Sequence, residues 1–303
     1  TLDVEDGRVA SARVTTPLYR GFEQILVGRP IGDALVIAPR ICGICSVSQS
    51  LAAAGALAAF SGATPAANGV LATALAHAAE NLADHLSHFY LFFMPDFARA
   101  QYAGAPWHAA TAERFTAVKG RASGEFLPVR SRLLEVMGLV AGKWPHSLAF
   151  RAGGTTRALD LGAKTRLRAI LADVRAFAET VLFGARLEAI AALDTVEALE
   201  RLAADGRGDL GRFLRLAAAL DLHRLGPGPG TVMSYGAYPG TGGGGAPLFA
   251  AGLHEIGSGA DLPLQPGRIV EDPSRAWLAG EAASPARAET LPDIDRADAY
   301  SWA

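Results

Sequence analysis

Two long amphipathic helices set the strongest limit on what this sequence can fold into. Apolar residues recur at helical spacing from residue 71 to residue 93, and the run ends near Pro95. A second such run extends from about Asp160 to Phe183, with its charged side chains mostly on the opposite side. Residues 2–14 instead alternate apolar and polar side chains around Asp6-Gly7, which predicts a β-hairpin. We therefore expect a mainly helical (α+β) fold, a long-helix bundle core preceded by a small N-terminal β element.

Capping residues predict where several helices begin and end. The helix after the two cysteines should end at Gly62, and Thr64-Pro65 has the pattern of the next helix start. Asp194 with Glu197 resembles a capping box ahead of residues 196–204. We predict one domain over residues 1–303, with four segments: an N-terminal β element and short helical turn (1–36), a cysteine loop and helix (37–62), a helical core (63–225) and a loop-rich segment (226–303) that 226-GPGPG-230 and 240-GTGGGG-245 interrupt.

Composition excludes several classes of function. The net charge is -2 and 19% of the residues are charged, without a long basic or acidic block. We therefore expect no nucleic-acid partner and no binding to a membrane surface through bulk charge. The most apolar window, residues 86–97, is too short to span a bilayer, so we expect no membrane insertion. No signal peptide is visible, which favours the cytoplasm, although we expect both chain ends to be cut.

The chain has two cysteines, Cys42 and Cys45, and their spacing alone leaves three interpretations open. They could form a redox pair, half of a metal site, or two buried residues without chemistry. Cys45 precedes a predicted helix start, where the helix dipole and free N–H groups stabilise a thiolate. Arg40 adds positive charge, and Gly43 lets the backbone pass close to a ligand. This context favours half of a site for a soft metal, without naming the metal.

Two alternatives to such a half-site are weaker. A closed structural zinc site needs four ligands, and neither a third cysteine nor a nearby histidine is present to complete it. A thioredoxin-like redox pair belongs between a strand and a helix of an α/β domain, whereas the sequence after Cys45 predicts a series of long helices. A redox protein therefore predicts a reversible disulfide and a sheet around the pair.

Several segments, taken together, resemble a known family. The segment 40-RICGICSVSQS-50 resembles the N-terminal metal-binding signature of the large subunits of [NiFe] hydrogenases, R-x-C-G-x-C-x-x-x-H. The resemblance covers nearly the whole chain and implies the fold of that subunit. The further segments that agree in order and spacing are 19-YRGFE-23, 88-HFYLFFMPD-96, 142-GKWPHSLAFRAGG-154, 269-IVEDPSRAWL-278 and 300-YSW-302.

The resemblance implies a nickel–iron centre that splits H2 into protons and electrons. Cys42 would be a terminal nickel ligand, and Cys45 would bridge nickel to an iron that carries carbon monoxide and cyanide. A small-subunit partner, forming a heterodimer, would remove the electrons through iron–sulfur clusters. A dry cavity and tuned surroundings of the metal ligands would be the contribution of the protein.

Two other residues take on implied roles. Glu23 matches a family glutamate that binds a magnesium ion, and His146 matches a histidine near the small-subunit contact. On the residues alone, Glu23 could instead pair with Arg20 or Arg29, and His146 could be a packed histidine. His85 and His88, at i, i+3 on the long helix, are interpreted as core or interface groups.

The sequence departs from the family signature at Gln49, where the signature has histidine. Glutamine can also donate a hydrogen bond near the bridging thiolate, but it cannot titrate. This change is typical of the H2-sensing branch of the family, which implies slow turnover and a histidine kinase signalling partner. An uptake hydrogenase is the alternative.

Half of the expected metal ligands are missing from the printed sequence. The family has a second C-x-x-C near its C-terminus and an R-x-E-G glutamate ahead of the region where this chain begins. We expect the chain to be a fragment that is inactive alone. The remaining alternative is a metal-free scaffold, similar to the quinone-reductase relatives of the family, although both cysteines are retained.

Overall fold

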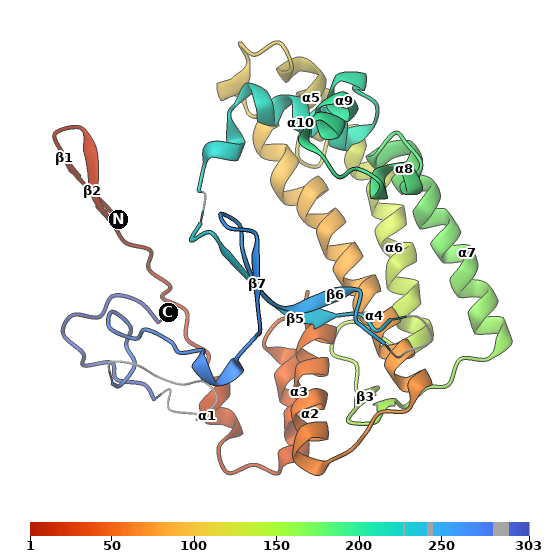
Figure 1. The fold of residues 1–303 in the computed structure, drawn as a ribbon, viewed down its shortest axis with the longest axis vertical. Coiled ribbons are helices and arrows are strands. Elements are labelled where there is room, and N and C mark those ends of the chain that lie inside the picture. Colours follow the sequence, from red (N-terminus) through yellow and green to blue (C-terminus); the bar gives the residue numbers. More distant parts are fainter. Residues whose placement is uncertain (227, 241–244, 281–290, 303) are drawn as a thin grey trace. The chain divides into compact units, whose positions relative to one another are not determined.

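The computed structural model describes residues 1–226, 228–240, 245–280 and 291–302 (Figure 1). Most of the predicted glycine break at 240–245, namely residues 241–244, lies outside these ranges. The helices are α1 Phe22–Leu26, α2 Ala34–Ile37, α3 Ser46–Ser61, α4 Ala67–Ser87, α5 His108–Phe115, α6 Arg121–Ala141, α7 Leu161–Phe177, α8 Leu187–Ala191, α9 Val196–Asp205 and α10 Gly208–Ala219. The strands are β1 Leu2–Glu5, β2 Arg8–Ala12, β3 Phe150–Arg151, β4 Gly154–Thr155, β5 Thr231–Ala237, β6 Phe249–Glu255 and β7 Ala260–Leu262.

Two compact units make up the chain, one formed by residues 28–230 and 237–249 and the other by residues 1–27, 231–236 and 250–303. In the first unit, α4, α6 and α7 run side by side, with α6 packed against both neighbours (Figure 1). The predicted mainly helical fold with a long-helix core is confirmed. Within the described residues, the helices are too short or too polar to cross a lipid bilayer.

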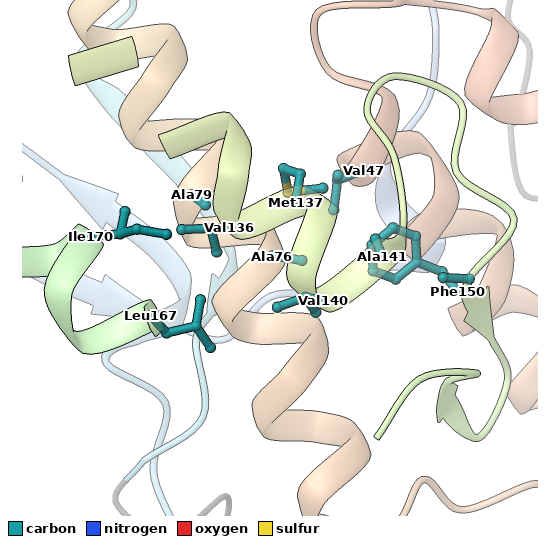
Figure 2. Close-up of a cluster of buried hydrophobic side chains, with 11 residues drawn as sticks. Val47, Ala76, Ala79, Val136, Met137, Val140, Ala141, Phe150, Leu167 and Ile170 are labelled. Carbon is teal, nitrogen blue, oxygen red and sulfur yellow. The ribbon is translucent and has the colours of Figure 1, made fainter. Parts of the chain in front are cut away.

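The first hydrophobic core lies where α3, α4, α6 and α7 meet. Figure 2 shows small side chains of α4, Ala76 and Ala79, among larger ones such as Val136 of α6 and Ile170 of α7. Val136 and Ile170 are fully buried. Burying one such side chain contributes about 1.5–3 kcal/mol, so this cluster holds the helices together. Val47 extends the same core into the first turn of α3, directly after the cysteines.

The buried face of α4 is not the one that its leucines predict. Leu71 is 39% exposed and Leu82 is 46% exposed, whereas Ala76, Ala79 and Ala83 are buried. Alanines allow the α4 backbone to approach α6 closely, and larger residues on α6 fill the space between them. The large side chains on α4 mark its helical period correctly, but Leu71 and Leu82 do not lie on its buried face.

A second core surrounds the residues that follow α4. Tyr90 is buried among aromatic rings and stacks on Phe126 of α6 with ring centroids 5.2 Å apart. Its hydroxyl donates to Asp209 of α10 at 2.8 Å. Arg114 of α5 also donates to Asp209, through Nη2 at 2.6 Å, and to Glu125 at 2.9 Å. This buried network joins four elements of the helical unit.

Helix ends agree with the sequence in part. α3 ends at Gly62 as predicted, with a left-handed φ of 68° that glycine adopts without strain. α4, however, begins at Ala67 with Ala66 as its N-cap residue, and not at Thr64-Pro65. The predicted start is therefore wrong by two residues. Thr195, not Asp194, caps α9, because its hydroxyl accepts from the Ala198 amide at 3.2 Å.

The unit that holds both chain ends contains the hairpin of β1 and β2 and most of β5, β6 and β7, whereas the short pair β3-β4 lies in the helical unit. β1 and β2 pair antiparallel around Asp6-Gly7, which confirms the predicted hairpin. Tyr19 stacks on Trp302 at 4.1 Å, and the Thr16 amide donates to Ser301, so the two terminal segments pack together. The loop-rich prediction for residues 226–303 missed a three-stranded sheet in the order β5-β6-β7. Its strands have mostly exposed side chains and lack a strict apolar–polar alternation, which hid them in the sequence.

Candidate metal centre

Cys42 and Cys45 lie in a tight loop between a short 3-10 turn, Ala38–Arg40, and α3. Both are half-buried free thiols. The loop folds back on itself, because the Cys45 amide donates to Cys42 Sγ at 3.2 Å. Cys45 is the N-cap residue of α3, as the sequence predicted. Both sulfur atoms are therefore held within one turn of backbone, as ligands of a shared metal ion would need to be.

Gln49 lies one helical turn after Cys45 and faces its sulfur. Its Nε2 donates to Cys45 Sγ at 3.7 Å, a distance within the usual range for sulfur acceptors, while its backbone amide donates to the Cys45 carbonyl oxygen at 3.1 Å. Gln49 therefore donates a hydrogen bond to the Cys45 thiol, as the sequence analysis expected of a glutamine at this position. An amide donor at this place favours the thiolate over the thiol.

Glu80 of α4 is the residue that the sequence did not reveal. It is 2% exposed, and its carboxylate accepts from the amides of Val47, at 2.9 and 3.1 Å, and Ser48, at 3.1 Å. The hydroxyls of Ser46 and Ser48 and the indole Nε1 of Trp144 also donate to it, the indole at 2.9 Å. A sequence signal did exist, because Glu80 lies on the same helical face as Ala76 and Ala83, where a charge is out of place.

The carboxylate of Glu80 changes the expected electrostatics of the cysteine pair. The sequence predicts that free amides at the start of α3 stabilise a Cys45 thiolate, but Glu80 accepts from two of those amides. Burial raises the pKa of the Cys45 thiol above its usual value, and Cys42 raises it further. The Gln49 amide opposes this rise in pKa, whereas the negative charge of Glu80 adds to it. Without a metal, Cys45 therefore favours the neutral thiol.

His146 lies against the same loop. Its Nδ1 donates to the carbonyl oxygen of Pro39 at 2.8 Å, which leaves Nε2 of a neutral ring as the acceptor. A Cβ atom on Gly43 would lie 3.9 Å from both Cε1 and Nε2 of this ring. His146 thus covers the backbone between the two cysteines, and it adopts a left-handed φ of 58° to do so.

The other predicted residues occupy different surroundings. Arg40 is exposed at the end of its 3-10 turn. Glu23 is exposed in the first turn of α1, where its charge adds to the rise that burial causes in the pKa of Tyr19. Glu23 belongs to the unit that holds the chain ends, and the cysteines belong to the helical unit.

Three histidines lie on α4 or in the turn that follows it: His77, His85 and His88. His85 and His88 are both exposed, so neither is a core group, and His88 stacks on Phe93 with ring centroids 5.7 Å apart. Sequence reasoning assigned no role to His77, which is half-buried and packs its ring against Tyr238. Burial lowers the pKa of His77, although the negative charge of Glu80 opposes that change.

A cavity of about 150 Å³ adjoins Glu80. Its wall includes Ile44 of the cysteine loop, Asp84, Arg130 and Trp144. The guanidinium of Arg130 lies 5.5 Å from the centroid of that ring and donates to Ser87 at 3.1 Å. The surroundings of the loop thus combine apolar walls with a few fixed polar groups.

The thiols fit half of a metal centre. Two adjacent sulfur ligands with an N–H donor on each suit a soft or borderline metal such as nickel, iron or zinc. Over residues 1–226, 228–240, 245–280 and 291–302, no group of three or more potential metal ligands comes together. The helices around the pair also argue against a thioredoxin-like redox site, which requires a sheet there.

Comparison with known proteins points to one family. Residues 20–135 match the family model described as nickel-dependent hydrogenase. A chain of the F420-non-reducing hydrogenase of Methanothermobacter marburgensis is 32% identical over 168 residues, covering 53% of the present sequence and 34% of that protein. The periplasmic [NiFeSe] hydrogenase large subunit of Desulfomicrobium baculatum is 29% identical over 171 residues, covering 51% and 33%.

Solved structures agree over almost all of the chain. The reduced Ni-Fe-Se hydrogenase of D. vulgaris Hildenborough superposes with a TM-score of 0.76 and 27% identity, covering 99% of this chain and 58% of that one. The reduced enzyme of Desulfomicrobium baculatum, at 22% identity and a TM-score of 0.72, shares the fold. The chain thus matches about a third of the length of the two curated relatives and somewhat more than half of the solved chains.

Proposed function

This chain is a relative of the large subunits of nickel-dependent hydrogenases, and on that premise we propose that it provides half of the ligands of a nickel–iron centre that cleaves H2. The observation that carries the proposal is the pair Cys42 and Cys45, held in one turn with Gln49 donating to the second sulfur. The centre, once bound, would supply the cleavage of H2 and the transfer of its electrons.

The residues around the pair would prepare the ligands for the metal. Cys42 and Cys45 would lose their protons on binding, because thiolates are the form that coordinates metals. The Gln49 amide favours that form at Cys45.

The remaining ligands must come from elsewhere, since the 303 residues contain two cysteines. We propose that a second C-x-x-C, outside the printed sequence, completes a site of four thiolates. A small subunit with iron–sulfur clusters would be the electron partner, with His146 close to its contact. Glu23, a hard oxygen ligand, would bind magnesium. Mutation of Glu23 to glutamine should then lower the bound magnesium without lowering nickel.

Metal analysis of the full-length protein, matured and purified with its partner, tests the main proposal. We expect nickel and iron in stoichiometric amounts, and the loss of both nickel and H2 cleavage in Cys45→Ser. Cys42→Ser should behave in the same way. Full H2 cleavage in Cys45→Ser would refute the assignment. A folded complex without nickel would instead favour a metal-free scaffold related to quinone-reductase subunits.

Gln49 supports a finer proposal, that the protein senses H2 and does not oxidise it in bulk. The donor beside Cys45 is an amide that does not gain or lose a proton near neutral pH, where the family signature has a histidine, which can. A histidine kinase would then be the signalling partner. Turnover of H2 by the purified complex should be slow, and Gln49→His should change it while nickel remains bound. Turnover as fast as that of a bulk H2-oxidising enzyme would support the uptake alternative.

A further inference from the structure

We propose that Glu80 is a positioning residue for the metal-binding cysteines, because its carboxylate fixes the first turn of α3 and, with it, the sulfur of Cys45. The inference rests on the proposed role of Cys42 and Cys45 as metal ligands, but not on which metal they bind. It concerns a residue of α4, far from the cysteines in sequence, that the signature segment does not include.

The carboxylate joins the cysteine loop to two other parts of the helical unit. Glu80 comes from α4, accepts from the Val47 and Ser48 amides at the start of α3, and accepts from the indole of Trp144 in the segment after α6. Cys45 directly precedes this first turn of α3. A shift of the carboxylate would therefore shift the cap residue and its sulfur.

The segment that carries Trp144 also holds the other side of the loop. His146, two residues after Trp144, donates to the carbonyl oxygen of Pro39, which precedes Cys42. Glu80 binds the chain directly after Cys45, and it also binds Trp144. Both ends of the cysteine loop are thus held by hydrogen bonds. Glu80 binds the end after Cys45 directly, and it also binds the segment whose His146 holds the end before Cys42.

The burial of Glu80 makes its hydrogen bonds necessary, because a buried charge without partners is strongly destabilising. A carboxylate that is 2% exposed needs strong compensation, and the hydrogen bonds that Glu80 accepts within the described residues come from α3 and from Trp144. Amides at a helix start are good partners for an anion, so the interaction stabilises both the charge and the turn. Partners of metal ligands of this kind typically change metal affinity by about 10–100-fold when they are substituted.

Asp84 offers a matched control. It lies one helical turn after Glu80 on α4, lines the same cavity and carries the same charge, but it is exposed. Asp84→Asn therefore removes one negative charge near the loop without removing a hydrogen bond to α3. Glu80→Gln removes the charge but keeps one oxygen acceptor, and Glu80→Ala removes both.

Two measurements on the metal-free 303-residue chain test the proposal. The first is amide hydrogen exchange over residues 45–50, which should be faster in Glu80→Ala, faster to a lesser degree in Glu80→Gln, and unchanged in Asp84→Asn. The second is Cd²⁺ binding, followed by its thiolate charge-transfer absorption, with Cys42→Ser/Cys45→Ser as the blank. We expect Glu80→Ala to weaken Cd²⁺ binding by about 10–100-fold and Glu80→Gln to recover part of the loss.

Each outcome decides for or against the positioning role. Cd²⁺ affinity in Glu80→Ala equal to that of the unsubstituted chain would overturn it, even if the midpoint of thermal unfolding falls, because a purely structural residue would give that result. If Glu80→Ala does not fold, the comparison of Glu80→Gln with Asp84→Asn decides, and equal Cd²⁺ affinities would overturn the proposal.

The test also separates this inference from the proposed function. If the full-length protein lacks nickel while Cd²⁺ binding still depends on Glu80, the nickel proposal fails and the positioning role stands. If nickel is bound and Cd²⁺ binding ignores Glu80, the positioning role fails alone.

Discussion

The backbone amide of Cys45 donates to the sulfur of Cys42 at 3.2 Å, so the two thiols are neighbours in space before any metal joins them. This proximity contributes to the raised pKa of Cys45, after burial as the largest cause. A raised pKa keeps the thiol protonated over a wider pH range than in the unfolded chain. Its contribution to stability is complete below the usual thiol pKa and is lost as the pH rises through the folded value.

The pH dependence of thiol alkylation tests whether the pKa of Cys45 is raised. In Cys42→Ser, where Cys45 is the single thiol, burial should still hold the midpoint of iodoacetamide reactivity above pH 9.0, the usual value. Adding Gln49→Ala should move the midpoint higher, because the amide that favours the thiolate is gone. A midpoint below pH 9.0 in Cys42→Ser would show that the helix start outweighs burial.

The buried ion pair between Arg114 and Asp209 should matter more for stability than any exposed pair. Arg114→Met would leave Asp209, which is 1% exposed, without its main partner and should lower the free energy of unfolding by about 3–5 kcal/mol. Arg132→Met, which breaks more exposed bridges to Glu135 and Asp173, should change it by at most about 1 kcal/mol. Urea unfolding of both variants measures the difference, and similar values would contradict the prediction.

Phe126 should be among the most sensitive core positions. It is fully buried and stacks on Tyr90, so Phe126→Ala would leave a cavity and lower the free energy of unfolding by about 3–5 kcal/mol. Phe92→Ala is the control, because that ring is 63% exposed, and its effect should stay within about 0.5 kcal/mol. Thermal and urea unfolding would test the pair, and a large loss in Phe92→Ala would indicate that its ring packs more than its exposure suggests.

His77 should titrate below its ordinary pKa of 6.5, because burial favours the neutral ring. Its contribution to stability is therefore present above pH 6.5 and is lost as the pH falls through the lower folded value. Glu80→Gln should lower the pKa of His77 further, since the carboxylate opposes the effect of burial. An NMR titration of the ring protons measures both values, and a midpoint at or above 6.5 would contradict the prediction.

The sequence predicted where helices and the hairpin lie better than it predicted which face of a helix is buried. The spacing of apolar residues and the glycines at helix ends and turns correctly predicted α3, from the cysteines to Gly62, and the hairpin around Asp6-Gly7. These signals are local in the sequence. The core face of α4 was missed, since alanines such as Ala76 carry little hydrophobic signal and become core only against the large residues of α6. The sheet β5-β6-β7 was missed because its pairing is set by partners distant along the chain.

The candidate site was predictable where it is contiguous. Cys42, Cys45 and Gln49 lie within one loop and one turn, so a single short segment that resembles a family signature was enough to select all three as candidates. Glu80 and Trp144 reach the same loop from segments that only the tertiary fold brings together. Local sequence patterns do not indicate which distant segments meet. The electrostatic prediction for Cys45 failed for the same reason, because the partner of the α3 amides was unknown.

The hydrogen bonds that Glu80 makes to Val47 and Ser48 also determine when the half-site takes shape. Because a side chain of the protein already satisfies these amides, the first turn of α3 does not depend on a metal to hold its form. The entropy lost in ordering this turn belongs to the folding of the chain and not to metal binding. A metal delivered late would therefore meet a preorganised receptor, and the protein could fold first and be loaded afterwards.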